Sequence, residues 1–129
     1  MDRHIAQVGE FHGKFGVYTR QSPTTDIPGD VKELRLRLLQ EELDELKQAV
    51  GADDLVEVAD ALGDLLYLVF GTAHAFGMAG KLKEVFEEIH RSNMSKLGPD
   101  GRPVLREDGK VMKGPGFFKP NLAPILGRA

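Results

Sequence analysis

The sequence has 129 residues, enough for one domain with its own core, and we expect a single domain over residues 1–129. Hydrophobic residues make up 41% and charged residues 29%, and no apolar run is long enough to span a membrane. The net charge of −3 gives no reason to expect a nucleic-acid polymer as partner. There is no cysteine and the first residues show no secretory signal, so we expect a cytoplasmic protein.

The first predicted element is a helix over residues 2–15, which Gly16 ends. Its apolar residues recur near one side: Ile5, Val8, Phe11 and Phe15. His12 lies close to this stripe, where it is either a hydrogen-bonded residue at the edge of the core or a contact to a substrate. A turn-rich segment with two prolines follows and is predicted to be a loop.

The next helix ends near Gly51 and carries carboxylates on a face that begins apolar. At about 100° per residue, one broad face holds Leu34, Leu38, Glu41, Glu42, Glu45 and Ala49. Of the three glutamates, Glu41 lies nearest the polar side of the helix. A second apolar seam consists of Leu36, Leu39, Leu43, Leu46 and Val50.

The link after Gly51 is short, so the following helix must return antiparallel beside its predecessor. Between residues 62 and 73 the only charge is Asp64, which predicts a helix that is buried on every side. Three acids fall within about 60° of one another on its helical wheel: Glu57, Asp60 and Asp64. The two sets of carboxylates are therefore expected to face each other across one gap.

Several ionised carboxylates in one interior must be neutralised by protonation, by basic side chains or by a cation, because an unpaired buried charge is costly. No Lys or Arg lies between Lys47 and Lys81. A divalent metal is the simplest answer, and carboxylate oxygens suit the hard ions Mg²⁺, Mn²⁺ or Ca²⁺. The alternative is that these acids are surface residues or ion-pair partners.

Residues 81–94 are predicted to form another amphipathic helix, with Leu82, Val85, Phe86 and Ile89 on its apolar face. Asn93 and Lys96 continue this face and suit contacts to a phosphate or a base, unless the basic residues here only offset the helix dipole. Glycine and proline are dense from Pro99 on. Asp108 and Gly109 predict a short hairpin with a type I′ turn.

The chain thus divides into a helical body, residues 1–97, and a Gly/Pro-rich basic tail, residues 98–129. Residues 96–129 carry a net charge of +4 and the rest of the chain −7. This asymmetry fits a polyanionic substrate held through a metal, or simply an attraction between tail and body. The segment KGPGFFKP, from Lys113 on, is expected either to close over a ligand or to pack onto a partner subunit.

These motifs resemble the all-α nucleoside triphosphate pyrophosphohydrolases, the superfamily of MazG, dimeric dUTPases and phosphoribosyl-ATP pyrophosphohydrolase. The shared pattern is EExxE, a spacer and ExxD, which here reads Glu41-Glu42-x-x-Glu45, eleven residues, and Glu57-x-x-Asp60. Small MazG-like proteins also share the segments FHxxFG, HRSNMSK, DGK and KGP, present here at residues 11–16, 90–96, 108–110 and 113–115.

One departure from the family pattern concerns the last acid. In many MazG proteins the last acid directly precedes two leucines and an aromatic residue. Here Asp64 holds that position, and Ala61 stands where the partnering Glu of the family pattern would be. Either Glu57 and Asp60 are the metal ligands, which we favour, or the ligand positions on this helix are shifted by one turn toward Asp64.

The resemblance implies an α-helical bundle that assembles as a homodimer or homotetramer. Together with the elements predicted from the residues, we expect an all-α fold, an antiparallel bundle of about four helices with an irregular C-terminal tail and a short β-hairpin. It implies Mg²⁺ as cofactor, with Mn²⁺ as a substitute. The implied reaction cleaves a nucleoside triphosphate between the α and β phosphates to give the monophosphate and pyrophosphate. The expected substrate is dUTP or a small set of deoxynucleotides, which are thereby kept out of DNA.

The resemblance also implies a role for each matching position. The metal ligands would be Glu42, Glu45, Glu57 and Asp60, with Asp64 behind them or as a further ligand. Glu42, and after it Glu41, would orient or deprotonate the attacking water. The substrate contacts would be Asn93, Lys96, Arg91 and Lys113 on the phosphates, Phe15 on the base and His12 near the sugar. The alternative to an enzyme is a non-catalytic helical dimer that binds a cation or a nucleotide.

Overall fold

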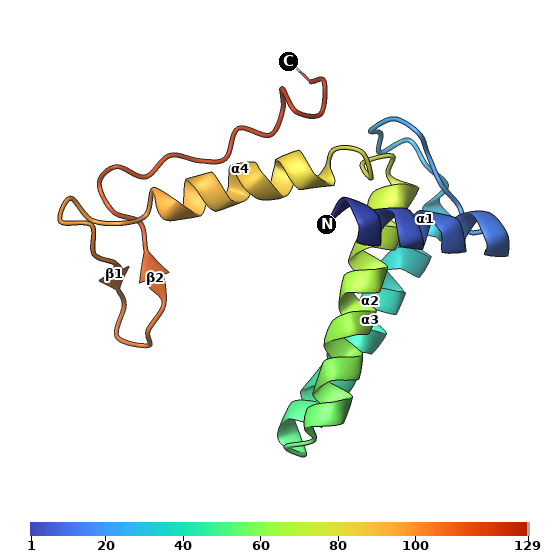
Figure 1. Ribbon diagram of the computed structural model, residues 1–129, viewed down its shortest axis with the longest axis horizontal. Coiled ribbons are helices and arrows are strands. Elements are labelled where there is room, and N and C mark those ends of the chain that lie inside the picture. The colour runs from blue at the N-terminus through green and yellow to red at the C-terminus, as the bar shows by residue number, and fades with distance from the viewer. Residues whose placement is uncertain (129) are drawn as a thin grey trace. The chain divides into compact units, whose positions relative to one another are not determined.

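A computed structural model of the chain describes residues 1–128 (Figure 1). These residues form four helices and one short antiparallel hairpin near the C-terminus, which confirms the predicted all-α fold. None of the four helices is both long and apolar enough to cross a membrane. The chain divides into two compact units, Met1–Gly80 and a second that begins at Lys81. The single domain with a body and tail that meet at residue 97 stays a prediction.

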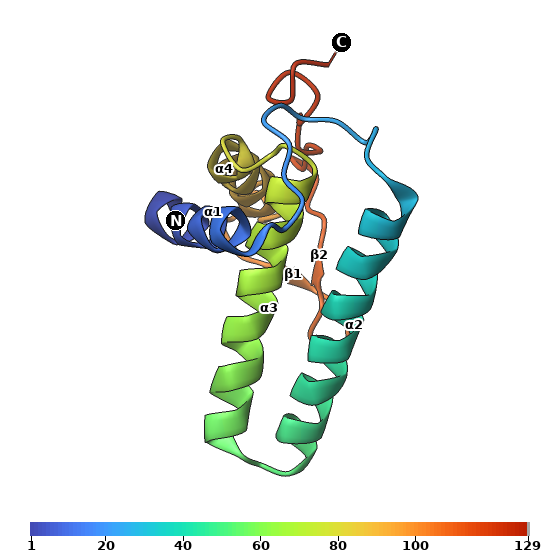
Figure 2. The same ribbon diagram turned by 90° about the vertical axis from the view of Figure 1, so that its right-hand side faces the viewer.

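The first unit contains α1 (Asp2–Phe15), α2 (Gly29–Gly51) and α3 (Leu55–Ala75). Helices α2 and α3 lie side by side and antiparallel, as Figure 2 shows, which confirms the prediction from their short link. Asp54 caps α3, because its carboxylate accepts a hydrogen bond from the Glu57 amide at 3.2 Å. A three-residue turn with a capped helix start fixes how the two helices are aligned along their length.

Helix α1 packs across the C-terminal part of α3 and supplies much of the core of this unit (Figure 1). Ile5 and Val8 are buried, and His74 Nε2 donates to the Ile5 carbonyl at 2.8 Å. The helix ends as predicted at Gly16, whose φ of 67° lies in the left-handed region that glycine adopts without strain.

A buried polar junction, formed by Arg35, His12 and Thr72, lies where the three helices meet. Arg35 is 5% exposed, and its guanidinium donates to Thr72 Oγ1 at 3.2 Å and to the Leu68 carbonyl at 3.1 Å. His12 is equally buried, and its Nδ1 donates to the Tyr18 carbonyl at 3.2 Å. Burial lowers the pKa of both Arg35 and His12. Within residues 1–128 no carboxylate forms an ion pair with Arg35.

The prediction that α3 is buried on every side is wrong for the single chain. Leu62, Leu66 and Val69 are 49%, 57% and 43% exposed. The apolar seam of α2 is uncovered in the same way, at Leu36, Leu43 and Val50. Helices α1 and α2 cover only part of the circumference of α3, and a hydrophobic pattern does not tell whether the same chain or a partner covers an apolar face.

The second unit contains α4 (Leu82–Met94) and the hairpin of β1 (Val104–Leu105) and β2 (Val111–Met112), with Val104 opposite Met112. The chain after the hairpin returns along α4 (Figure 1). Ser92 Oγ donates to the Phe118 carbonyl at 2.8 Å, and the Asn121 amide donates to the Glu88 carboxylate at 2.7 Å. The tail is therefore fastened to the helix that precedes it.

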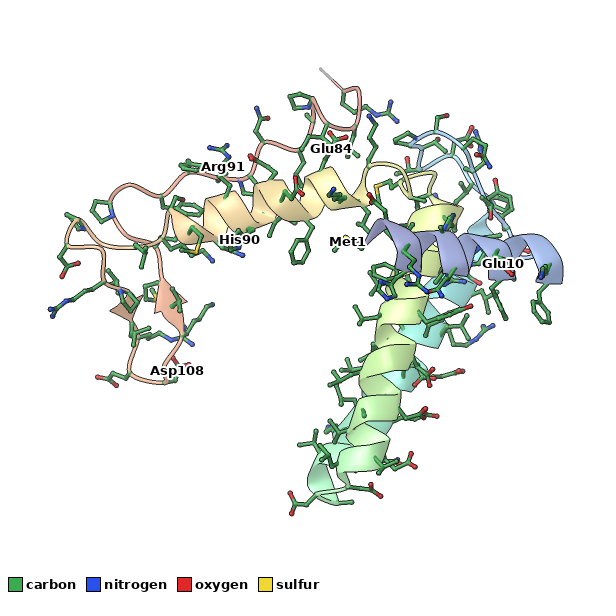
Figure 3. The ribbon with its side chains drawn as sticks, in the orientation of Figure 1. Met1, Glu10, Glu84, His90, Arg91 and Asp108 are labelled. Atoms are coloured by element: carbon green, nitrogen blue, oxygen red, sulfur yellow. The ribbon has the colours of Figure 1, made fainter. Side chains whose placement is uncertain are left out.

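The predicted type I′ turn is wrong, although the hairpin itself is confirmed. Figure 3 shows Asp108 at the tip of the hairpin, and among the turn residues only Gly109 has a positive φ, 87°. The Arg106 amide donates to the Lys110 carbonyl at 2.8 Å, which leaves three residues in the loop. Asp108 does not have a positive φ, and its carboxylate accepts hydrogen bonds from the Lys110 amide and from Arg106. The result is the three-residue loop with a left-handed glycine at its end.

Replacement of Gly71 by alanine should destabilise the first unit. A Cβ on Gly71 would collide with the Arg35 guanidinium and lie 2.9 Å from His12 Nε2. Such overpacking costs about 1–3 kcal/mol, which exceeds the gain of about 1 kcal/mol from better helix propensity. Gly63→Ala is the matched control on the same helix, because a Cβ there meets nothing within 4 Å. Urea unfolding should show opposite signs for the two variants, and equal effects would contradict this account of the junction.

Candidate functional site

Acidic side chains of α2 and α3 converge at the seam between the two helices. Glu42, Glu45 and Asp64 each offer a carboxylate oxygen, and these three oxygens lie within 4.8 Å of one another. Glu42 and Glu45 share a face of α2 because they are three residues apart, and the antiparallel return of α3 brings Asp64 opposite them. We call these three residues the acid cluster.

A pocket of about 500 Å³ adjoins the acid cluster on the side of the α2–α3 turn. Its lining consists of Glu45, Gln48, Ala49, Ala52, Asp54, Glu57, Asp60 and Ala61. Ala49 and Ala61 are both buried, and their short side chains leave space between the helices that larger residues would fill. The pocket therefore gives a ligand access to the seam beside the acids.

The acid cluster is electrostatically unfavourable without a counter-ion. One carboxylate oxygen of Glu42, Oε2, is buried without a hydrogen-bond partner. Burial, a hydrogen bond with Glu45 and the charge of Asp64 raise the pKa of Glu42 to about 7. Burial and the charges of Asp60 and Glu45 likewise raise the pKa of Asp64. Nowhere in residues 1–128 does a Lys or Arg form an ion pair with these acids.

These residues fit a hard divalent cation. All the donors are carboxylate oxygens, which Mg²⁺ and Mn²⁺ prefer, and one of them lacks any other partner. Raised pKa values show that the ionised forms are destabilised by burial and mutual repulsion, which a positive ion would relieve. The fit is chemical as well as geometric.

The structure brings together some of the predicted acids and not others. Glu42 and Glu45 lie in the acid cluster. Asp64 lies there too, although the assignment that we favoured from the sequence placed it behind the metal ligands. Glu57 and Asp60 are exposed and line the adjoining pocket. Glu41 is exposed and lies outside both groups. Which of these residues bind a metal stays a prediction.

The two predicted substrate contacts of the first unit have very different surroundings. Phe15 is 70% exposed and stacks on Phe11 with 4.4 Å between the ring centroids. His12 is buried, and its Nδ1 is engaged by the Tyr18 carbonyl and the Thr19 hydroxyl. Phe15 is therefore available to a ligand, whereas His12 belongs to the polar junction.

The other predicted substrate contacts lie in the second unit. Asn93 and Lys113 are exposed and Lys96 is half-buried. Arg91, labelled on α4 in Figure 3, pairs with Glu88 at 2.7 Å and lies 4.3 Å from the Phe118 ring centroid. Arg91 is thus already engaged within its own unit, while Asn93, Lys96 and Lys113 remain available.

The sequence analysis did not identify Arg35 as a buried residue beside the acids, although its spacing from Glu42 could have indicated it. Arg35 precedes Glu42 by seven residues, or two helical turns, so both fall on the same face of α2. The acid cluster and the buried cation therefore occupy one seam. Together the fold and the cluster define a class, the all-α proteins that hold converging carboxylates between two antiparallel helices.

Comparison with known proteins identifies the family. The model of the phosphoribosyl-ATP pyrophosphohydrolase family matches residues 8–93, well over half of the chain. The chain therefore belongs to the phosphoribosyl-ATP pyrophosphohydrolase family, within the MazG-like superfamily of all-α NTP pyrophosphohydrolases. This confirms the resemblance seen in the sequence.

Two individual proteins are similar to the chain. Uncharacterized protein L479 of Acanthamoeba polyphaga mimivirus is 37% identical over 93 residues, which cover 70% of this chain and 37% of that relative. The chain thus spans little more than a third of the relative's length. A crystal structure of a protein from Exiguobacterium sp. 255-15, provisionally named an NTP pyrophosphohydrolase, is 30% identical. The likeness covers 91% of this chain and 88% of that one, with a TM-score of 0.47.

The stability of the metal-free protein should fall as the pH rises from about 4.5 to about 7. Folded Glu42 holds its proton up to about pH 7, whereas unfolded glutamate releases it near 4.5. The folded state binds more protons in this window, so stability present below it is lost as the pH rises. Thermal unfolding in EDTA at several pH values measures the effect. Glu42→Gln should remove part of this fall, and a pH dependence identical to wild type would contradict the assignment.

Addition of Mg²⁺ or Mn²⁺ should raise the unfolding temperature, because an ion that binds only the folded state stabilises it by about 2.7 kcal/mol at one hundred times its Kd. Glu45→Gln and Asp64→Asn should each diminish this shift, since both carboxylates lie in the acid cluster. Glu33→Gln, a change at the exposed start of α2, is the matched control and should keep it. A full shift in Asp64→Asn would show that Asp64 is no ligand.

Proposed function

We propose that the protein is a Mg²⁺-dependent nucleoside triphosphate pyrophosphohydrolase that cleaves between the α and β phosphates. The observation that carries the proposal is the convergence of Glu42, Glu45 and Asp64 around a buried oxygen without a partner. Membership of a family named for a pyrophosphohydrolase supports the same reaction. The products would be a nucleoside monophosphate and pyrophosphate.

The metal would be held by the acid cluster, with Asp60 and Glu57 of the adjoining pocket as further ligands and Mn²⁺ as a substitute for Mg²⁺. When bound, the ion supplies positive charge against the triphosphate and makes the attacking water more acidic. Glu42 is the proposed catalytic residue, and Glu41 the second candidate. Glu42 would orient or deprotonate the water, a role that carboxylates serve in general acid–base catalysis.

The proposed substrate contacts are residues of α1, of α4 and of the segments that follow α4. Asn93, Lys96 and Lys113 offer an amide and two ammonium groups to the phosphates, with Arg91 as a further candidate. The exposed ring of Phe15 is available to stack on the base. His12 is left out of these contacts because its ring is buried and already hydrogen-bonded.

The proposed substrate is dUTP or a small set of deoxynucleoside triphosphates, removed before they enter DNA. The family name adds phosphoribosyl-ATP as a rival substrate. Both contain a triphosphate or polyphosphate that would need the same cation and the same basic side chains. The two candidates differ in the sugar and base, so a direct comparison of turnover separates them.

We propose a homodimer, with a homotetramer as the alternative. The uncovered apolar residues of α2 and α3 support this assembly, because a second copy of the chain would remove them from water. Leu62, Leu66 and Tyr67 on α3 are the residues we expect in the contact. Sedimentation of the purified chain measures the assembly directly.

A pyrophosphate-release screen tests the activity. The panel contains dUTP, the common and modified triphosphates, and phosphoribosyl-ATP, each with Mg²⁺. Release should be fastest with dUTP or a related deoxynucleotide. Glu42→Gln should lower kcat by about 10²–10⁴-fold, the usual contribution of a general base, while the protein stays folded. Asp60→Asn should also weaken turnover.

Two outcomes of the screen separate the alternatives. Release that survives both substitutions would show that the site assignment is wrong even though the activity is right. Stabilisation by metal without any pyrophosphate release would favour the non-catalytic helical dimer that binds a cation or a nucleotide.

A further inference from the structure

The second unit contains a basic pocket that the sequence motifs do not reveal as a whole. It has a volume of about 430 Å³ and is lined by Lys96, Arg106, Lys110, Val111, Met112 and Lys113. Arg106 and Lys110 belong to the hairpin turn and are absent from the predicted substrate contacts. We propose that this pocket binds the polyphosphate chain of a nucleotide, and that Lys110 is the hairpin's main contribution.

The charge of the basic pocket is largely uncompensated. Arg106 pairs with Asp108, whose Oδ1 it meets at 2.9 Å. No carboxylate within residues 1–128 forms an ion pair with Lys96, Lys110 or Lys113. The C-terminus of α4 contributes about half a negative charge, too little to balance three ammonium groups. The pocket therefore favours an anion with several charges.

Backbone contacts hold these lysines around the pocket. The Gly114 amide donates to the Lys96 carbonyl at 2.9 Å. A Cβ on Gly114 would lie 2.7 Å from this carbonyl oxygen, so the close approach requires glycine. Lys113 Nζ lies 5.0 Å from the Phe117 ring centroid, and Lys110 is placed by the hairpin. Lysines from separate parts of the sequence are thus gathered by the fold itself.

A second pocket, of about 410 Å³, adjoins the basic one and shares Lys96 and Val111 with it. Its remaining lining is Asn93, Met94, Leu97 and Pro103, which is mostly apolar with one amide. Ligand pockets of this size are commonly apolar with a few polar groups that fix orientation. In this proposal the apolar pocket, rather than the Phe15 ring, takes the base and sugar, while the phosphates lie among the lysines.

The inference rests on the proposed function for the identity of the ligand as a nucleotide, and it extends that function to a binding step that needs no metal. The acid cluster is in the other unit and presents carboxylates, which attract cations, whereas this pocket presents ammonium groups. The two sites are therefore separable by experiment. Binding in the presence of a chelator reports the basic pocket without hydrolysis.

Isothermal titration of the full chain in EDTA tests the pocket, with inorganic triphosphate and dUTP as ligands. Lys110→Gln and Lys113→Gln should each weaken the binding of inorganic triphosphate by about tenfold, the loss expected for one charge-assisted hydrogen bond. Lys119→Gln is the matched control, because Lys119 is exposed in the tail and does not line the pocket. Equal affinities for Lys110→Gln and Lys119→Gln would overturn the proposal.

Further arms identify the ligand and keep the two proposals apart. Binding of dUTP should be tighter than that of inorganic triphosphate, and equal affinities would overturn the role of the apolar pocket. A single-stranded oligonucleotide that displaces dUTP at lower concentration than inorganic triphosphate does would overturn the assignment to a nucleotide. Glu42→Gln should bind inorganic triphosphate in EDTA as the wild type does. Intact binding without pyrophosphate release from any substrate would refute only the proposed hydrolysis.

Discussion

The main physical constraint on the first unit is that carboxylates which repel one another lie close together between α2 and α3. Burial, together with the charges of neighbouring carboxylates, raises the pKa of both Glu42 and Asp64. The acids stay together because rigid helices carry them, with Ala49 and Ala61 packed between. A site on helices holds its geometry better than one on loops. The same rigidity that keeps the repelling carboxylates close together would offer a cation a preorganised set of oxygens.

The polar junction supplies the only other buried charge that the structure describes in this seam, and it is too remote to neutralise the acids. Arg35 lies two helical turns from Glu42 on α2, about 10 Å by helix rise. At that separation one cation attracts one carboxylate by about 1.6 kcal/mol in a partly hydrated interior. The Arg35 guanidinium also donates hydrogen bonds to the Thr72 hydroxyl and the Leu68 carbonyl. It therefore fixes the packing of α2 on α3 and does not neutralise the acid cluster.

Hydrophobic periodicity predicted the four helices and the short link predicted the antiparallel pair, because both are local properties of the sequence. The choice among Glu57, Asp60 and Asp64 is of another kind. These acids share one face of α3, so the helical wheel cannot rank them. The alignment of the two helices along their length decides which acid lies opposite Glu42, and the three-residue turn and small residues at the seam set that alignment. The exposed face of α3 was missed because a hydrophobic pattern does not tell whether the chain itself covers an apolar face.

The separation of charge between the units gives their two candidate sites opposite preferences. Residues 1–80 hold seven Lys or Arg against fourteen Asp or Glu, whereas residues 81–129 hold ten against six. A free polyphosphate is repelled by the acid cluster, and a free divalent cation is repelled by the basic pocket. Glu42 and its neighbours therefore favour a cation, whereas Lys110 and its neighbours favour an anion with several charges. Each unit thus discriminates among ligands by the sign of their charge.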